Sequence, residues 1–567
     1  TGPVPILCRP GASQNPKMNC EVKALRNQRE TADIILHHGR VLTVDAKDSI
    51  EEAVAIQGKH ILAVGKNQDI LALAGENTQL IDAVGRTVMP GFIDAHLHYG
   101  MYGLLDHGVI NLTYPRVKSI REIQELIRQA AAGRPTGEWI KLNGYDHNKI
   151  EEGRHPTRQE LDEAAPDHPV QCTRICGHMG VYNTVGLRSA GIHSSEGYAE
   201  GEVELNPDGS LHGLLRDTAH MVASRKVIFP REELLEGFRS ADRILAECGI
   251  TSAHDAGTYG AQATSVMQDA CNDGLIRTRL YPMIFDIYGK DSAKEYLECF
   301  LRTGVHTGCG GEHFRLGPAK IMLDGSSSGP SCAVIEGYTH DPQNHGIRVW
   351  EQEEADQVIL AAHRAGFQVT AHAVGDYAVT IIVNAIERAM QAYPRKDCRH
   401  RIEHCGITNL KLIHRIAKLG IVPISNPSFI TINGSDYNRY YGSRTDYLFA
   451  MRSYLDHGIC TAIGSDAPIT PPDPMSAFFA ALNRKDGKTL EDVGPGQQIT
   501  ALEMVRMFTY NGAYASFEED IKGSLEPGKL ADVVLLSEDI LRYPAERIRD
   551  VKVLYTISDG RIIYQRS

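Results

Sequence analysis

Apolar and polar residues alternate in short runs near both ends of the chain. Residues 32–86 contain ADIILHHGRVLTVD, EEAVAIQGKHILAVG and QLIDAVGRTVMPG, and the closing part of the chain contains GKLADVVLLSEDI, KVLYTISDG and RIIYQ. Period-two alternation between turn residues is typical of β-strands. We therefore predict one small β-sandwich domain that residues 31–88 and 520–567 build together.

Between these ends, short apolar runs alternate with helical patterns such as REIQELIRQAAA, ELLEGFRSADRILAECG and YAVTIIVNAIERAMQAY. Such alternation is the signature of βα units and a parallel sheet, hence of an α/β fold. The candidate strands are GFIDAHLH, EWIKLNGYD, GITSAHDAG, FRLGPAKIMLDG, FQVTAHAVGD, HRIEHCGI, IVPISNPSF and CTAIGSDAPI. They match the strand number of a TIM-like (β/α)8 barrel. We place the barrel at residues 89–519, with an inserted subdomain at about 147–230.

Composition and charge narrow the class of protein. Apolar residues make up 42% of the 567 positions and charged residues 23%, as in a globular protein with a large core. The net charge of −12 disfavours nucleic acid as a partner. We find no membrane-spanning run and no secretory signal, so we expect a cytoplasmic protein without a membrane partner. Residues 1–17 precede Met18 and are interpreted as left by cloning or processing, and residues 1–30 as an extension outside the fold.

The segment GFIDAHLH ends in His96 and His98. Positions i and i+2 of a strand point to the same face, so both rings can reach one metal ion, although an isolated H-x-H also arises by chance. Imidazole and carboxylate groups suit Zn, Mn, Fe or Ni, and zinc is the first choice. Further residues able to serve metal chemistry stand in other predicted strands, which end at the edge where such barrels carry their active sites. They are Lys320, His372, His404 and Asp466.

Eight segments follow one another in a distinctive order: PGFIDAHLH, ICGHMGVYN, GITSAHDAG, KIMLDG, HAVGD, RIEHC, GSDAP and GSLEPGKLADVVLL. With them the chain resembles the amidohydrolase superfamily from about Thr31 onward, and most closely its N-substituted formamide deformylase-like group. The resemblance implies that His96, His98 and Asp466 bind one metal ion and that His372 and His404 bind a second.

Lys320 stands where superfamily members often carry a lysine that is carboxylated by carbon dioxide and bridges two metals. A free ammonium cannot ligate a cation, so Lys320 is carboxylated, deprotonated or not a ligand. Some relatives operate with one metal, so the sequence leaves one or two ions per chain open.

The resemblance also implies a mechanism. A metal lowers the pKa of bound water from about 15.7 to near 7, which supplies a hydroxide to attack a carbonyl carbon. Asp466 lies where it could take the proton of the water and pass it to the leaving nitrogen. We predict hydrolysis of an amide-type C–N bond in a small N-acyl compound, formamide, carbamate or cyclic amide. Decarboxylation, ester hydrolysis and deamination are alternatives, and a binding protein without turnover is a third reading.

Other residues are predicted to contact the substrate. His178 resembles a position near the substrate in this group and could polarise a substrate carbonyl as a catalytic residue, but a surface or capping role is equally open. Tyr145 and Asp324 are predicted to line the pocket, and Asp324 also suits a turn before glycine. The tyrosine-rich segment Ile430–Tyr447 could contact an aromatic or extended substrate, or form a packed lid or subunit contact. The family resemblance implies a homo-oligomer.

Overall fold

The computed structural model describes residues 31–175, 177, 179–257, 259–286 and 289–567. The predicted extension over residues 1–30 therefore lies outside the described residues, as does His178. Strands and helices alternate along most of the described chain, which is an α/β protein as predicted. Among its described helices, none has both the length and the apolar character needed to cross a membrane.

Strands from both ends of the chain pair in one six-stranded sheet. Its order is β24 (Arg561–Gln565), β23 (Val553–Ser558), β22 (Val533–Leu536), β7 (Thr87–Pro90), β2 (Arg40–Leu42) and β3 (Ile50–Glu51). The join between the two ends is the antiparallel pair β22 and β7, in which Val534 faces Met89. Residues distant in sequence thus build one sheet.

A second sheet of four strands consists of N-terminal residues. Its order is β5 (His60–Gly65), β4 (Ala53–Gln57), β1 (Ala32–His37) and β6 (Ala74–Asp82). Buried residues of both sheets, among them Leu36, Val54, Val533 and Ile557, share one hydrophobic cluster, so the sheets pack on each other. The exact boundaries of a sandwich domain stay a prediction.

Parallel strands form the centre of the molecule. One sheet has the order β16 (Arg279–Leu280), β15 (Ile250–Asp255) and β8 (Phe92–Leu97), and the other runs β17 (Ala319–Met322), β18 (Val369–Ala373), β19 (Arg401–His404), β20 (Val422–Ser425) and β21 (Ala462–Ile463). A parallel bridge between Ile284 and Ala319 links one pair of edges. At the other pair of edges, β8 and β21, the Asp466 N–H donates to the His96 carbonyl oxygen at 2.7 Å. Closure of these sheets into one barrel stays a prediction.

The prediction that EWIKLNGYD is a central strand is wrong. Its strand β10 (Ile140–Tyr145) pairs with β9 (Ile110–Asn111) and β11 (Val170–Arg174) in a separate sheet. The order of that sheet is β13 (Val203–Leu205), β14 (Leu211–Arg216), β12 (Met179–Tyr182), β11, β10 and β9. Because β10 also has parallel neighbours, its local pattern cannot tell which sheet it joins. The segment that contains β16 and Ile284 stands between β15 and β17 instead.

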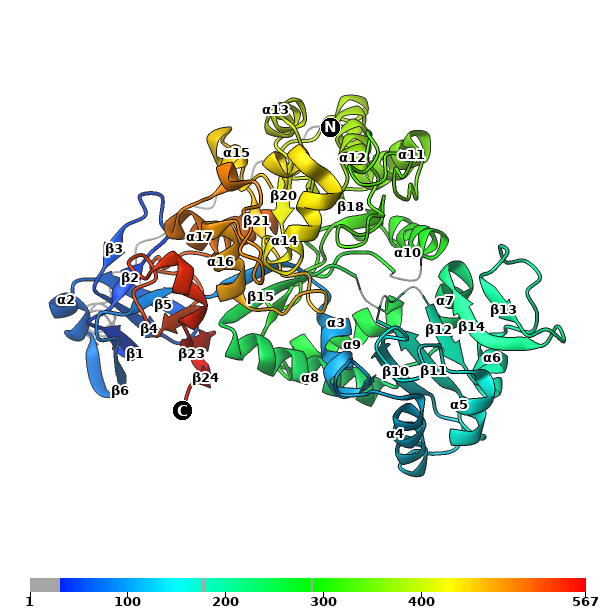
Figure 1. Cartoon of the computed structure of the whole chain (residues 1–567). Helices are drawn as coiled ribbons and strands as arrows, with labels where there is room; N and C mark the ends of the chain where they lie inside the picture. The colour runs from blue at the N-terminus through cyan, green and yellow to red at the C-terminus, as the bar shows by residue number, and fades with distance from the viewer. Residues whose placement is uncertain (1–30, 176, 178, 258, 287–288) are drawn as a thin grey trace, which may run out of the picture.

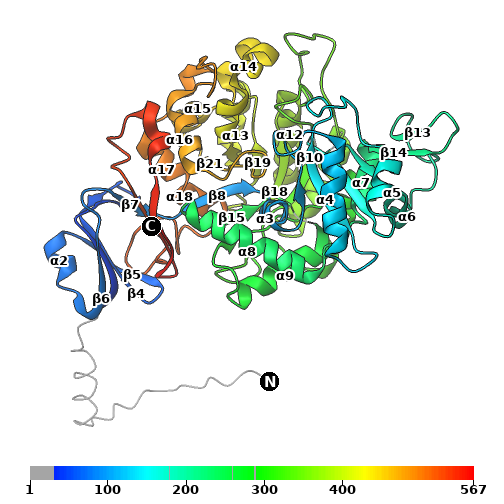
Figure 2. The ribbon, with the colours of Figure 1, turned by 60° about the horizontal axis from the view of Figure 1, so that its bottom comes forward.

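The inserted sheet and the sheets of the chain ends lie at opposite ends of the molecule. Figures 1 and 2 both place the central strands between them, with α8 and α9 on one side and α12 and α13 on another. The sheet of the insertion also includes β9, which precedes the predicted start at about residue 147, and the bounds of the insertion stay a prediction.

The three helices predicted from sequence are confirmed as α4 (Ile120–Ala132), α8 (Arg231–Glu247) and α12 (Asp376–Ala392). In α4, the Ser119 hydroxyl accepts from the Glu122 N–H and begins the helix, while Ile123 and Ile127 are buried four residues apart. The other helices are α2 (Asn67–Leu71), α3 (Tyr99–His107), α5 (Arg158–Ala164), α6 (Thr184–Ala190), α7 (Asp217–Ser224), α9 (Gly260–Asn272), α10 (Lys290–Thr303), α11 (Gln352–Arg364), α13 (Leu410–Leu419), α14 (Ser428–Tyr441), α15 (Met451–Asp456), α16 (Pro474–Asn483), α17 (Ala501–Met507) and α18 (Tyr510–Ala515).

A buried arginine connects the central strands to the sheet of the chain ends. Arg279, only 1% exposed, donates to both carboxylate oxygens of Asp532 and also to Asp559. These charge-assisted bonds join residues more than 250 positions apart, so they fix the two parts of the molecule against each other.

Candidate metal centre

His96 and His98 lie at the end of β8, and their ring centroids are 5.8 Å apart. Asp466, just after β21, places Oδ1 3.4 Å from Nε2 of each histidine. Ligand atoms of the three side chains all lie within 4.8 Å of one another. The structure thus gathers three of the six predicted ligands around one point.

His372 and His404 lie beside this point. The ring of His404 is 4.7 Å from that of His96 and 4.5 Å from that of His372, measured between centroids. These residues come from β8, β18 and β19, whose carboxyl ends meet at one edge of the parallel strands. Both histidines are therefore placed where a second cation of the same centre could be held.

The hydrogen bonds of the histidines show which ring nitrogens are free. Carbonyl and carboxylate oxygens only accept, so a ring nitrogen that bonds to one carries the proton. Nδ1 of His96 donates to Glu403 at 2.5 Å, that of His98 to the Gly257 carbonyl at 3.2 Å, and that of His404 to Asn426 Oδ1 at 2.9 Å. All three Nε2 atoms are left with a lone pair, which is the form that binds a metal.

His372 has the opposite orientation. Its Nε2 donates to the Gly325 carbonyl at 3.0 Å, which leaves Nδ1 with the lone pair. Burial is the main reason why the pKa of His372 falls to about 4, so the ring is neutral at physiological pH.

The donor set fits a divalent cation. His96 Nε2 is fully buried and has no hydrogen-bond partner among the described residues. A buried imidazole nitrogen without a partner is costly, and beside a carboxylate and two further imidazoles the missing partner is naturally a cation. Such a cation also explains why Asp466 and His96 lie close together in a buried space.

Asp466 is held in an unusual backbone conformation, with a φ of 61°. Burial alone would raise its pKa, but the rings of His96 and His98, each with Nε2 3.4 Å from Oδ1, hold that pKa well below its usual range. The carboxylate is therefore ionised and points toward the histidines. Strained, buried and charged residues of this kind cluster at functional sites.

Lys320 is buried on β17, and its Nζ donates to the Ala256 carbonyl at 2.7 Å. Burial lowers the pKa of Lys320 to about 8, with nearby acidic groups acting in the opposite direction. The neutral amine, which is the form that reacts with carbon dioxide, is therefore accessible near physiological pH.

A buried ion pair behind His96 was not predicted from the sequence. Glu403 accepts from His96, from Thr370 at 2.7 Å, and from Arg401 at 2.9 and 3.0 Å. Arg401 also donates to the Ala95 carbonyl, next to His96. The i, i+2 spacing of Arg401 and Glu403 in RIEH was the one sequence signal for this pair, because it places both on one face of a strand.

Two residues that were predicted to contact the substrate have hydrogen-bond partners within the protein. Tyr145 is buried in the core of the inserted sheet, and its hydroxyl bonds to His155 Nδ1 at 2.8 Å. Asp324 is fully buried and accepts from the backbone N–H groups of Ala333, Val374 and Gly375. Asp324 therefore ties together the loops that follow β17 and β18; these bonds join distant segments and are not those of a local turn before glycine.

The tyrosines of the segment Ile430–Tyr447 are packed inside the protein. Tyr437 and Tyr441 are at most 1% exposed, and both bond to Ser327. They belong to a hydrophobic cluster with Tyr338 and Phe449. Of the three predicted roles of this segment, namely substrate contact, packed lid and subunit contact, the burial of these tyrosines favours the packed segment.

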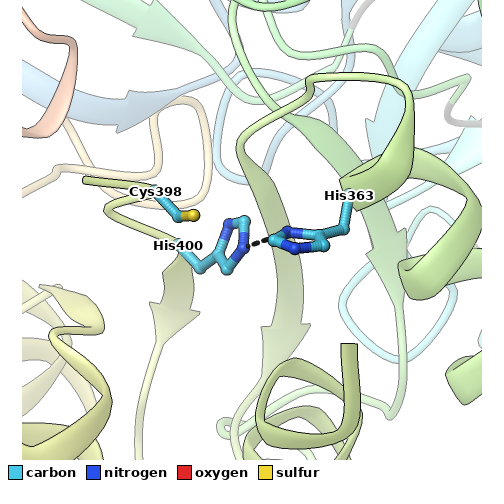
Figure 3. A group of neighbouring side chains, drawn as sticks. All are labelled: His363, Cys398 and His400. Carbon is cyan, nitrogen blue, oxygen red and sulfur yellow. Dashed lines mark hydrogen bonds between the residues drawn. The ribbon is translucent and has the colours of Figure 1, made fainter. Parts of the chain in front are cut away.

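A second group of ligand-type side chains is buried elsewhere, and it consists of His363, Cys398 and His400 (Figure 3). The Val369 N–H donates to Nδ1 of His400, so the proton of that neutral ring is on Nε2, which lies 2.9 Å from His363 Nδ1. His363 Nε2 in turn donates to the Tyr393 carbonyl at 2.7 Å. Each ring nitrogen already has a partner, so this group is a structural hydrogen-bond chain.

Comparison with known proteins points to one family. The model of a family described as "Amidohydrolase family" matches residues 79–564. The chain is 28% identical to N-substituted formamide deformylase of Arthrobacter pascens over 548 residues, which is 94% of this chain and 99% of the relative. It is 29% identical to Protein LONG AFTER FAR-RED 3 of Arabidopsis thaliana over 555 residues, 94% of this chain and 92% of that protein.

The solved structures give the same result. A metal-dependent hydrolase of Pyrococcus furiosus, described as uncharacterized, superposes with a TM-score of 0.73 at 25% identity. The match covers 90% of this chain and 100% of that structure. The similarity thus extends over the central strands and most of the remaining described chain.

Proposed function

Because this chain belongs to the amidohydrolase family and is an enzyme that acts on carbon–nitrogen bonds, we propose that it hydrolyses an amide bond of a small N-acyl compound, with an N-substituted formamide as the first candidate. The observation that carries the proposal is the convergence of His96, His98 and Asp466, with the Nε2 lone pairs of both histidines left free. The formamide is suggested by the name of one relative, which matches this chain over nearly its whole length.

Six residues of this chain would hold the cation or cations: His96, His98, Lys320, His372, His404 and Asp466. A divalent cation bound there supplies Lewis acidity and lowers the pKa of water. Zinc suits these ligands, and with two ions a carbamate on Lys320 would be the natural further ligand. A closed eight-stranded barrel is part of the proposal, since it brings all six residues to one rim.

Asp466 is the proton carrier of the proposed reaction. Its carboxylate takes a proton from water as the water oxygen attacks the carbonyl carbon. It then gives that proton to the amide nitrogen, the C–N bond breaks, and a carboxylic acid and an amine leave. Since Asp466 is ionised and lies between two histidines, it is ready to act first as a base.

The experiment compares Asp466→Asn with the parent enzyme on an N-substituted formamide, and follows released amine and formate separately. We expect a loss of about a thousandfold or more in kcat, because the amide cannot accept the proton. Asp456→Asn is the matched control, since that carboxylate is 58% exposed, pairs with Arg452 and is not one of the predicted site residues. Near-normal turnover by Asp466→Asn with its metal bound would refute the proton-carrier role.

Metal content per chain, measured by elemental mass spectrometry, distinguishes one ion from two. Parallel detection of ammonia, carbon dioxide and acid separates amide hydrolysis from deamination, decarboxylation and ester hydrolysis. If ammonia, carbon dioxide or acid is released and no amine is, the reaction is deamination, decarboxylation or ester hydrolysis, respectively, and not amide hydrolysis. A cytoplasmic location and a homo-oligomer stay predictions.

A further inference from the structure

A cavity of about 680 Å³ lies between α3 and the inserted sheet. Its walls include Met101 and Leu105 of α3, Leu142 of β10, and Met221 of α7. Cavities of this volume hold small organic molecules. The insertion thus builds a binding space that the central strands alone would not provide.

Three segments of the metal centre continue directly into the cavity wall. Pro468 and Ile469 follow Asp466, and Met101 follows His98 by three residues. Tyr259 follows Gly257, whose carbonyl fixes His98 Nδ1. The cavity wall thus includes residues that stand within three positions of two predicted metal ligands along the chain.

The cavity is lined by large apolar side chains, some of which are open to solvent. Ile175 of the inserted sheet is 50% exposed, and Ile469 on the loop after β21 is 58% exposed. Val227 and Phe229 contribute further apolar wall. Exposed apolar residues that face one concave surface from two separate elements indicate a site for an apolar ligand.

The two formally charged residues of the described wall are already compensated. Nζ of Lys141 donates to Glu233 at 2.6 Å and lies 3.8 Å from the centre of the Phe229 ring. Asp106 accepts from the Ser240 hydroxyl and lies 3.8 Å from Arg243. A charged ligand would therefore lose its hydration without gaining a free partner.

The part of the wall formed by β11 and α7 carries a group of polar side chains that are hydrogen-bonded to one another. Gln171 Nε2 donates to the Ser224 hydroxyl at 2.7 Å and to the Tyr182 hydroxyl at 2.8 Å. The Tyr182 hydroxyl also lies 3.0 Å from His220 Nδ1. Gln171, His220 and Ser224 all line the cavity, so a neutral hydroxyl or carbonyl could exchange hydrogen bonds with this group.

We propose that this cavity binds the non-reacting arm of the substrate, and that it selects an uncharged arm of aromatic size with a hydrogen-bonding group at its tip. The proposal deepens the proposed amide hydrolysis and rests on it for the reacting end. Selection comes from desolvation: neutral arms fill the apolar wall, whereas a carboxylate or ammonium finds no free counter-charge.

Two sets of probes test it on the metal-loaded enzyme. The first set has the arm alone, without a scissile bond: 2-phenylethanol, 2-(4-hydroxyphenyl)ethanol and 4-(2-hydroxyethyl)benzoate, followed by ligand-detected NMR. The second set contains the N-formyl derivatives of the corresponding arylethylamines, followed by amine release. In both sets we expect the phenol to rank first, the phenyl compound second, and the carboxylate at least about tenfold weaker.

Matched variants on α7 test whether the preference for neutral arms comes from the cavity wall. Met221→Lys introduces a cation into the wall, and we expect it to weaken the phenyl probes and strengthen the carboxylate probes by about tenfold each. Val222→Lys adds the same charge to the neighbouring residue, which is 39% exposed and is not part of the cavity wall, and should leave the ranking unchanged. Ser224→Ala should remove the advantage of the phenol over the phenyl compound.

The outcomes distinguish the two proposals. If the arm-only probes bind in the expected order but no N-formyl compound is hydrolysed, the formamide is wrong as the reacting end and the cavity assignment stands. If turnover occurs but the carboxylate equals the neutral arms, or Met221→Lys behaves like Val222→Lys, the cavity assignment is overturned.

Discussion

Glu403→Gln is the substitution that most directly tests how the metal centre is held. Glu403 is fully buried and accepts from His96, Thr370 and Arg401. The amide keeps the shape of the side chain but removes its charge. The NH2 group that the substitution introduces cannot accept a hydrogen bond. One of the two donors, His96 or Arg401, therefore loses its acceptor, whichever way the amide turns.

Two effects of different size follow. Removing one partner of a buried, hydrogen-bonded ion pair costs about 3–5 kcal/mol of folding free energy, because Arg401 stays buried without its counter-charge. Weaker orientation of a metal ligand by its hydrogen-bond partner costs about 10–100-fold in metal affinity. The latter corresponds to about 1.4–2.7 kcal/mol. We therefore expect both a lower melting temperature and weaker zinc binding.

The assay is a zinc titration in competition with a chromophoric chelator, at a temperature where the variant is fully folded. Thr370→Val is the matched control, because it removes one hydrogen bond from the same carboxylate and leaves the charge in place. It should lose about 1–2 kcal/mol of stability and keep its zinc affinity within about threefold. Unchanged zinc affinity in folded Glu403→Gln would show that Glu403 does not orient His96.

Three further substitutions test the surrounding structure. Burial, with help from His363, holds the pKa of His400 well below 6.5, so the unfolded chain takes up this proton first and stability falls as the pH drops below about 6.5. The loss reaches about 2 kcal/mol at pH 5, and urea unfolding of His400→Gln should show a flatter pH profile; an identical profile would contradict it. Tyr441→Phe removes the bond to the Ser327 carbonyl and should cost about 1–2 kcal/mol in urea, with substrate preference unchanged; an altered preference would revive the substrate-contact reading. Arg279→Met leaves Asp532 buried without its partner and should lower stability by about 3–5 kcal/mol in calorimetry, whereas a loss below about 1 kcal/mol would mean that this pair does not join the two parts of the chain.

The sequence was informative where residue type and position in a strand act together. His96, His372 and His404 each stand at or near the carboxyl end of a parallel strand, and the βα alternation was enough to bring them to one edge. The three predicted helices also have strong 3.6-residue periodicity and clear ends, as in α4 with Ser119 before its first residue. These features are local, so one sequence reveals them.

Features that depend on distant partners were missed. The pattern of β10 is that of any buried parallel strand, and only its pairing with β9 and β11 assigns it to the insertion. Glu403 resembles any charged residue near a strand end, because its four hydrogen bonds come from three different segments. Tyr441 could equally face a substrate or Ser327 until the fold buries it. Tertiary contacts decided each case.

The two buried histidine groups show why ligand-type residues alone do not define a metal site. In both groups the ligand atoms lie within 4.8 Å of one another, and most of the side chains are buried. In one, the protons of His363 and His400 are fixed along a chain that begins at the Val369 N–H and ends at the Tyr393 carbonyl, so no lone pair is left. In the group around His96, each histidine donates a hydrogen bond from one ring nitrogen, and its second ring nitrogen keeps a lone pair. The chemistry is therefore determined by which nitrogens remain free, and only the group around His96 offers them to a cation.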